Sequence, residues 1–132
     1  MKIEFKDKEW GLEWGLGCFQ LYAEEVAGVN RVDEVYVHVL DSVLNQYKLY
    51  YCAMLNWYKI QDETNELPFN FREFAMFLDK QPEEFHNKIM EDFRNSTFSG
   101  RSMEEHYRRL AEALEVVEDS SKKKASQATS DS

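Results

Sequence analysis

Glu83 and His86 are the two residues whose types and spacing come closest to a catalytic motif. They form Glu-x-x-His, a spacing that puts both side chains on one helix face in di-iron carboxylate bundles. Such a site needs a second Glu-x-x-His motif and two further inward-facing glutamates. Neither His38 nor His106 has a glutamate three residues before it, so the second motif is missing. We therefore interpret His86 as a surface residue of a helix, and keep a carboxylate-metal enzyme only as a remote alternative.

The residues that could support nucleophilic or phosphate chemistry form no complete motif either. Cys18 and Cys52 lie far apart, form no C-x-x-C motif and are surrounded by apolar residues, which is typical of buried, reduced thiols in a cytosolic protein. No G-x-S-x-G motif occurs. Gly15 and Gly17 form a local G-x-G, but a phosphate cradle needs more glycine and a helix start with Lys, Ser or Thr. We expect no enzyme, no cofactor and no bound metal.

Composition narrows the kinds of partner. The 25 Asp and Glu residues outnumber the 16 Lys and Arg residues, which gives a net charge of −9. Binding to nucleic acid or to an anionic membrane needs a clustered positive surface, which so acidic a chain disfavours. The chain has no apolar run as long as a membrane span, and its start lacks the apolar segment of a signal peptide. We expect a cytoplasmic protein with no nucleic-acid and no membrane partner.

Residues 2–14 predict a β-hairpin, because apolar residues alternate with charged residues or glycine on both sides of a short polar turn. A two-residue turn at Asp7-Lys8 would give complementary pairs on both faces. The predicted pairs are Phe5–Trp10 and Ile3–Leu12 on the apolar face, and Lys6–Glu9 and Lys2–Glu13 on the charged face. Because an isolated two-stranded ribbon is only marginally stable, its apolar face must lie on the helices or on another subunit.

The stretch from Val32 to Ile60 carries the longest helical pattern, with apolar residues at i, i+3, i+4 and i+7 and no Gly or Pro. Asn45-Gln46 is its weakest point, so the sequence leaves open whether the stretch is one helix or two. Its second half, from Tyr47 to Tyr58, has rings on several sides. A segment of this kind is normally central in a core, and it is also our hypothesis for where the core ends and a partner begins.

Further helices are predicted on both sides of this pattern. A short helix is expected to end at Gly28, where a left-handed residue suits a helix stop. Asn70 and Ser102 each begin a capping box, and Pro82 suits the first turn of a helix. The segment 96–100 is predicted to be a loop. The helix after Asn70 is expected to turn inward Phe71, Phe74, Ala75 and Leu78.

These patterns together predict a mainly α fold, with an N-terminal β-hairpin packed on a small bundle of about five or six helices. Residues 1–118 form one helical domain that includes the hairpin at 2–14. Its last helix, 102–118, is amphipathic. Residues 119–132 form a disordered C-terminal tail, because Ser120 to Ser132 contain no aromatic or branched aliphatic residue.

Four features follow one another along residues 1 to about 95: a hairpin, a glycine-marked aromatic helix start, a helix rich in Tyr and Ala, and an acidic helix. The segments are Ile3–Phe5 with Trp10–Leu12, Gly15–Phe19, Tyr50–Leu55 and Phe69–Phe74. This arrangement resembles the tail assembly chaperones of long-tailed, siphovirus-type bacteriophages. The last helix, 102–118, does not map onto the family.

The resemblance implies a small, non-enzymatic helical protein that binds the tape measure protein and tail tube subunits before the tail assembles, in the host cytoplasm. Such proteins are commonly made in a short form and in a longer form that a programmed ribosomal frameshift produces. Consecutive lysine codons are rich in A, so Lys122–Lys124 suggests a slippery site, with a solubilising patch as the ordinary alternative.

We expect client binding at large apolar residues beyond those that a single core requires. These candidates are Trp10, Trp14, Tyr50, Trp57 and Phe77. Trp and Tyr are favoured anchors at interfaces, although each is more often a core residue. The ring-rich face of the hairpin could instead build a homo-oligomer. The alternative function is a small helical adaptor or regulator of a mobile element that binds another protein.

Overall fold

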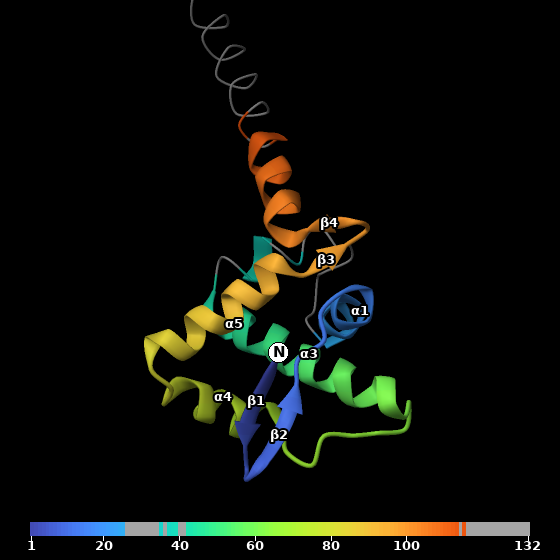
Figure 1. Ribbon diagram of the computed structural model, residues 1–132, viewed down its shortest axis with the longest axis vertical. Coiled ribbons are helices and arrows are strands. Elements are labelled where there is room, and N and C mark those ends of the chain that lie inside the picture. The colour runs from blue at the N-terminus through green and yellow to red at the C-terminus, as the bar shows by residue number, and fades with distance from the viewer. Residues whose placement is uncertain (26–34, 36, 40–41, 114, 116–132) are drawn as a thin grey trace, which may run out of the picture.

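The structure, a computed structural model, describes residues 1–25, 35, 37–39, 42–113 and 115 (Figure 1). The fold is mainly helical with an N-terminal two-stranded antiparallel hairpin, which confirms the predicted fold class. The expected helix stop at Gly28 and the expected tail at 119–132 lie outside the described residues. No helix in the described part of the chain is both long and apolar enough to cross a membrane.

Strands β1 (Lys2–Phe5) and β2 (Lys8–Gly11) form the hairpin, but in a register that differs from the predicted one. The two turn residues are Lys6 and Asp7, with φ of 52° and 60°, so the turn lies one residue earlier than expected. Turns with two left-handed residues match the twist of paired strands, and Asp tolerates that conformation well. The observed pairs are Lys2–Gly11, Ile3–Trp10, Glu4–Glu9 and Phe5–Lys8, so the predicted pairs Phe5–Trp10, Ile3–Leu12, Lys6–Glu9 and Lys2–Glu13 are wrong.

The predicted apolar face of the hairpin is nevertheless the buried one. Moving the turn by one residue shifts the pairing by two, and side chains repeat every two residues along a strand, so each keeps its face. The sequence left open whether this face packs on the helices or on another subunit, and it packs on helices of the same chain. The buried residues of the face are Ile3, Phe5, Trp10 and Leu12. The ring of Phe5 lies 4.8 Å from that of Phe69 and 4.6 Å from that of Phe77.

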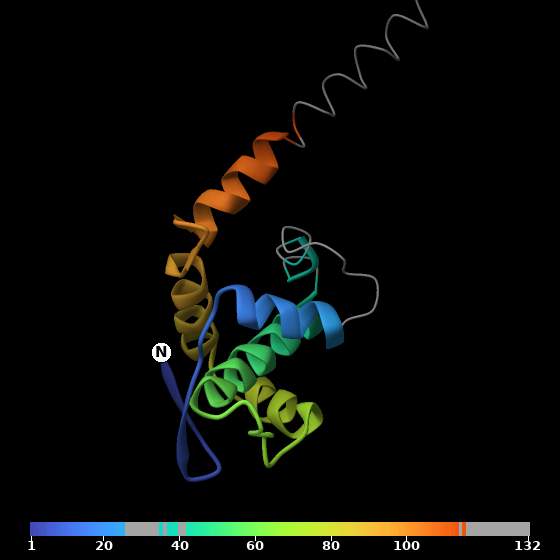
Figure 2. The same cartoon turned by 90° about the vertical axis from the view of Figure 1, so that its right-hand side faces the viewer.

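Helix α3 (Val43–Gln61) runs through the middle of the fold, with α1 (Leu16–Glu25) packed along it (Figures 1 and 2). The two helices are close because Gly17 has no side chain: a Cβ there would lie 2.4 Å from Oδ1 of Asn56. From α1, Cys18, Phe19 and Tyr22 enter the core with exposed fractions of 0%, 1% and 0%.

The 32–60 stretch is not one helix. Ser42 has an extended backbone (φ −153°, ψ 128°), residues 35 and 37–39 before it are helical, and α3 begins at Val43. The Ser42 hydroxyl accepts a hydrogen bond from the backbone N–H of Asn45 at 3.4 Å, which caps α3. Asn45-Gln46, the predicted weak point, lies inside the first turns of α3 and does not break it.

Helix α4 (Phe71–Asp79) follows a polar loop, and α5 (Glu83–Asn95) follows α4. The predicted cap of α4 is confirmed, since the Asn70 side chain accepts from the backbone N–H of Glu73 at 2.9 Å. Pro82 is the N-cap of α5 and therefore stands just before its first turn. From these helices Phe74, Leu78, Ile89 and Phe93 are fully buried.

The segment expected to be a loop at 96–100 takes part in a second small hairpin. Strands β3 (Thr97–Phe98) and β4 (Arg101–Ser102) pair across Ser99 and Gly100, whose φ values are 55° and 80°. Residues 103–113 then form a helix that extends away from the rest of the chain (Figures 1 and 2). The Ser102 hydroxyl accepts from the N–H of Glu105 at 3.2 Å, which is the predicted cap.

Candidate functional site

Glu83 and His86 lie in the first turn of α5. The His86 ring stacks on Tyr47, with 5.8 Å between the centroids and 16° between the planes, and Glu83 is exposed. Among the described residues, no three His, Cys, Asp or Glu side chains gather in a way that could hold a metal ion. In this structure His86 is therefore part of an aromatic contact between α3 and α5.

Cys18 and Cys52 are buried thiols that form no disulfide, as predicted. The Cys18 Sγ lies 3.8 Å from the carbonyl oxygen of Leu49, one turn before Cys52 on α3. Burial, and secondarily the neighbouring Cys52, raise the pKa of the Cys18 thiol well above its usual value. Because the thiolate is the reactive form, a thiol in this setting is a poor nucleophile.

Two of the five candidate client-binding residues, Trp10 and Tyr50, are core residues with exposed fractions of 2% and 1%. The Trp10 indole donates to the carbonyl of Phe5 at 3.0 Å, and the Tyr50 ring lies 6.0 Å from that of Trp14. In this conformation neither Trp10 nor Tyr50 offers surface to a partner. Trp10 is buried where the hairpin docks on α3 beside Trp57 and Tyr58, and the Tyr50 ring packs between Trp14 and Tyr47.

The other three candidates are partly buried and lie in different places. Trp57 covers the backbone of Gly11, where an added Cβ would lie 2.3 Å from the indole nitrogen. Phe77 lies against Phe5 and, at 5.9 Å between centroids, against Phe85. The structure brings Trp10 near Trp57 (6.3 Å), but the five residues do not form one patch.

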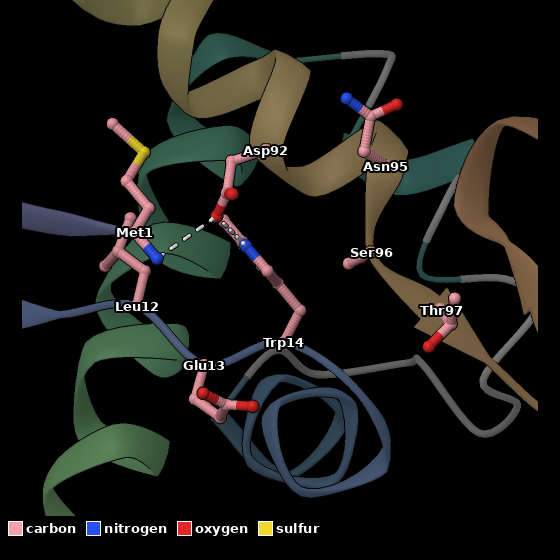
Figure 3. Close-up of a pocket in the computed structure, with 8 residues that line it drawn as sticks. All are labelled: Met1, Leu12, Glu13, Trp14, Asp92, Asn95, Ser96 and Thr97. Carbon is pink, nitrogen blue, oxygen red and sulfur yellow. Dashed lines mark hydrogen bonds and ion pairs between the residues drawn. The ribbon is translucent and has the colours of Figure 1, made fainter.

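Trp14 lines a polar hollow of about 360 Å³ where the chain leaves the hairpin (Figure 3). Its indole N–H donates to Oδ2 of Asp92 at 2.8 Å, and the amino group of Met1 lies 3.8 Å from the same oxygen. Figure 3 shows both contacts converging on this one carboxylate of α5. The contacts connect the N-terminal segment to α5, so we assign the hollow a structural role.

A more apolar depression lies between the start of α3 and the outer side of α4, and we call it the α3–α4 groove. Its volume is about 360 Å³. Leu44 and Met76 stand at its walls and are both 52% exposed, and the neighbouring Val43 is 59% exposed. The lining residues are Leu44, Tyr47, Phe71, Arg72, Ala75, Met76 and Asp79.

Two charged side chains, Arg72 and Asp79, line the α3–α4 groove. Arg72 and Asp79 are exposed, and neither has an ion-pair partner among the described residues. Desolvation, and secondarily the Asp79 carboxylate, raise the pKa of Tyr47 above its usual value of 10.0. The tyrosine is therefore neutral at physiological pH, and the groove presents an apolar floor with one cation and one anion.

Sequence reasoning did not identify this groove. Leu44 fits the inward stripe of the 32–60 pattern, and Ala75 was expected to face the core beside Phe74 and Leu78. The missed signal is that α4 is apolar on two sides: Phe74 and Leu78 are fully buried, whereas Ala75 and Met76 line the groove. A nine-residue helix needs only one apolar side to pack on a core.

A second depression, of about 610 Å³, lies between α1 and the end of α3. Ile60 stands there with 66% of its surface exposed, among the charged residues Glu24, Lys59 and Glu63. The mixture of charges makes this a less apolar surface than the α3–α4 groove. Ile60 thus provides an exposed apolar residue outside the groove for comparison.

Comparison with protein-family models, curated proteins and solved structures found no match for this chain. A functional assignment therefore depends on the surface of the molecule and on the sequence resemblance.

Proposed function

We propose that this chain is a non-enzymatic tail assembly chaperone of a siphovirus-type bacteriophage. It binds the tape measure protein and tail tube subunits in the cytoplasm of the host before the tail assembles. The resemblance over residues 1 to about 95 supports this proposal. The structural observation that carries it is the α3–α4 groove, an exposed apolar surface on an otherwise acidic domain.

The physical task of such a chaperone is to cover apolar helix faces. Tape measure proteins, as the family resemblance implies, are long and helical, and their apolar stripes would aggregate if left exposed. An amphipathic helix binds when its apolar side chains enter a hydrophobic groove at i, i+3, i+4 and i+7 spacing. The α3–α4 groove supplies such a surface through Leu44, Tyr47 and Met76.

Copurification with a tape measure fragment tests the proposal. Leu44→Glu and Met76→Glu place a charge in the groove, and we expect each to weaken capture by about tenfold or more, because a buried, unpaired carboxylate is costly. Ile60→Glu is the matched control, since it makes the same kind of change on an exposed apolar residue outside the groove. Capture by Ile60→Glu should stay close to that of the parent. Failure of the parent to capture the fragment would remove the proposal.

The surrounding genome offers a second, independent test. We expect a tube-protein gene upstream, a very long tape measure gene downstream, and an overlapping frame with an A-rich heptamer at the codons of Lys122–Lys124. Absence of the two neighbouring genes would argue for the alternative, a small helical adaptor.

A further inference from the structure

The outer stripe of α4 has a property that the proposed function does not use. Two copies of it, placed antiparallel, would match each other in charge and in apolar residues. Arg72, Ala75, Met76 and Asp79 all line the α3–α4 groove, and their spacing of three, one and three residues places them on one helix face. Along the helix the stripe carries a cation, two apolar side chains and an anion. Its midpoint falls between Ala75 and Met76.

The two charges are placed against the dipole of their own helix. Arg72 is the second residue of α4 and Asp79 is the last, whereas a helix favours anions at its start and cations at its end. The neighbouring Glu73 differs, because it forms an ion pair with Lys6 of the hairpin turn. Arg72 and Asp79 have no such partner among the described residues. Neither the dipole of α4 nor an ion pair within the described residues therefore accounts for the positions of these two charges.

We propose that the α3–α4 groove binds a second copy of this chain, with the two α4 helices antiparallel across a two-fold axis near Ala75 and Met76. Arg72 and Asp79 are seven positions apart in the chain, about 10.5 Å along a helix. Reversal therefore brings each Arg72 opposite the partner's Asp79, and the small Ala75 lets the helices approach closely. Each partner charge then lies at the helix end whose dipole favours it.

The exposed apolar residues give this contact its core. Leu44 and Met76 line the groove and are both 52% exposed. A two-fold interface uses each of these residues twice. Because α4 has only nine residues, the interface is smaller than that of a permanent dimer, and a concentration-dependent dimer is expected. The dimer does not depend on the identity of any client, but a client helix in the same groove would compete with the second copy.

Sedimentation velocity of the full chain, across a roughly hundredfold range of concentration, measures the monomer–dimer equilibrium. We expect the parent to move from monomer to dimer within that range. Arg72→Glu and Asp79→Arg each turn two attractions into two repulsions, and should raise the dimer dissociation constant by about tenfold or more. Arg101→Glu and Glu66→Arg make the same charge changes at exposed positions outside the groove, and should leave it within about twofold.

Mixing the two single variants gives the sharpest readout. In a heterodimer, the glutamate that R72E introduces in the first chain faces the arginine that D79R introduces in the second. The unchanged Asp79 of the first chain faces the unchanged Arg72 of the second. Both pairs are attractive, so we expect the mixture to dimerise although neither variant does so alone. The double variant R72E/D79R should recover the homodimer, and dimerisation of the mixture also shows that the single variants are folded.

Three results would overturn the proposal. These are a parent that stays monomeric throughout, single variants that dimerise like the parent, and a mixture that dimerises no better than its components. A monomeric parent that still captures a tape measure fragment through Met76 would leave the proposed function intact and assign the groove to the client alone. A parent that dimerises as described but captures no fragment would support the dimer and remove the chaperone proposal.

Discussion

Gly11 is a residue whose missing side chain decides how the hairpin docks. The indole of Trp57 lies on its backbone, and a Cβ would meet three atoms of that ring within 2.6 Å. We expect Gly11→Ala to lower the free energy of unfolding by about 1–3 kcal/mol, since the ring must leave its position to make room. Urea denaturation measures the change. Glu9→Ala on the same strand, which loses only an exposed ion pair to Lys2, should change stability by less than about 1 kcal/mol.

Tyr22 and Tyr50 carry buried hydroxyl groups without a hydrogen-bond partner among the described residues. A buried polar group without a partner costs free energy, so Tyr22→Phe and Tyr50→Phe should leave stability at pH 7 unchanged or raise it by about 1 kcal/mol. Tyr51→Phe is the contrasting control. Its hydroxyl donates to the carbonyl of Phe69 at 3.3 Å, so its loss should destabilise the fold. Thermal denaturation of the three variants distinguishes the two kinds of tyrosine.

The same buried hydroxyls make the fold sensitive to alkali. Burial raises the pKa of Tyr22 from 10.0 to about 12, and raises the pKa of Tyr50 as well. Above pH 10 the unfolded chain releases protons that the folded chain still holds, so the free energy of unfolding falls as pH rises towards 12. For Tyr22 alone the loss is about 2–3 kcal/mol across this window. Tyr22→Phe should flatten the decline; an equally steep decline would contradict this assignment.

At the scale of elements, α4 depends on a cap that the sequence revealed in advance. The Asn70 side chain accepts from the N–H of Glu73, so Asn70→Ala should cost about 1 kcal/mol, whereas Asn70→Asp keeps an acceptor and should cost much less. Chemical denaturation with both variants tests this. Equal losses in the two variants would mean that Asn70 acts through packing and not through the cap.

Other elements show where sequence reasoning stops. The break at Ser42 was missed because the apolar periodicity continues across it, from Val39 to Val43. A single residue with an extended backbone does not disturb this pattern. A serine with Asn45 three residues later was the available signal, and the Asn45 side chain donates to the carbonyl of His38 at 3.1 Å. The hairpin register was missed because two positions for a two-residue turn keep the same face buried.

At the scale of the whole molecule, the apolar residues that stay exposed are not the large rings proposed as binding residues. Large rings were the natural candidates for binding, yet Trp10 and Tyr50 are core because a chain with 14% aromatic residues packs its core largely with rings. The smaller residues Leu44 on α3 and Met76 on α4 remain exposed where they line the α3–α4 groove. Which of two apolar helix faces is covered depends on tertiary packing, and periodicity alone does not encode it.

The net charge of −9 applies to the whole chain and gives a prediction at that scale. We expect no electrophoretic shift with mixed-sequence DNA at low salt, where nonspecific electrostatic attraction would be strongest. Arg108 and Arg109 do not alter this expectation, because both form ion pairs with Glu105. A shift that disappears with added salt would show a basic surface that the described residues do not present.

The docking of the hairpin also has a consequence for synthesis on the ribosome. Phe5 is made more than sixty residues before its ring partners Phe69, Phe74 and Phe77. At about 5–20 residues per second, the ribbon waits for several seconds before α4 exists to receive it. During that interval the nascent chain carries an uncovered ring-rich ribbon. The hairpin therefore stays uncovered on this face until α4 emerges, although it precedes α4 in the chain.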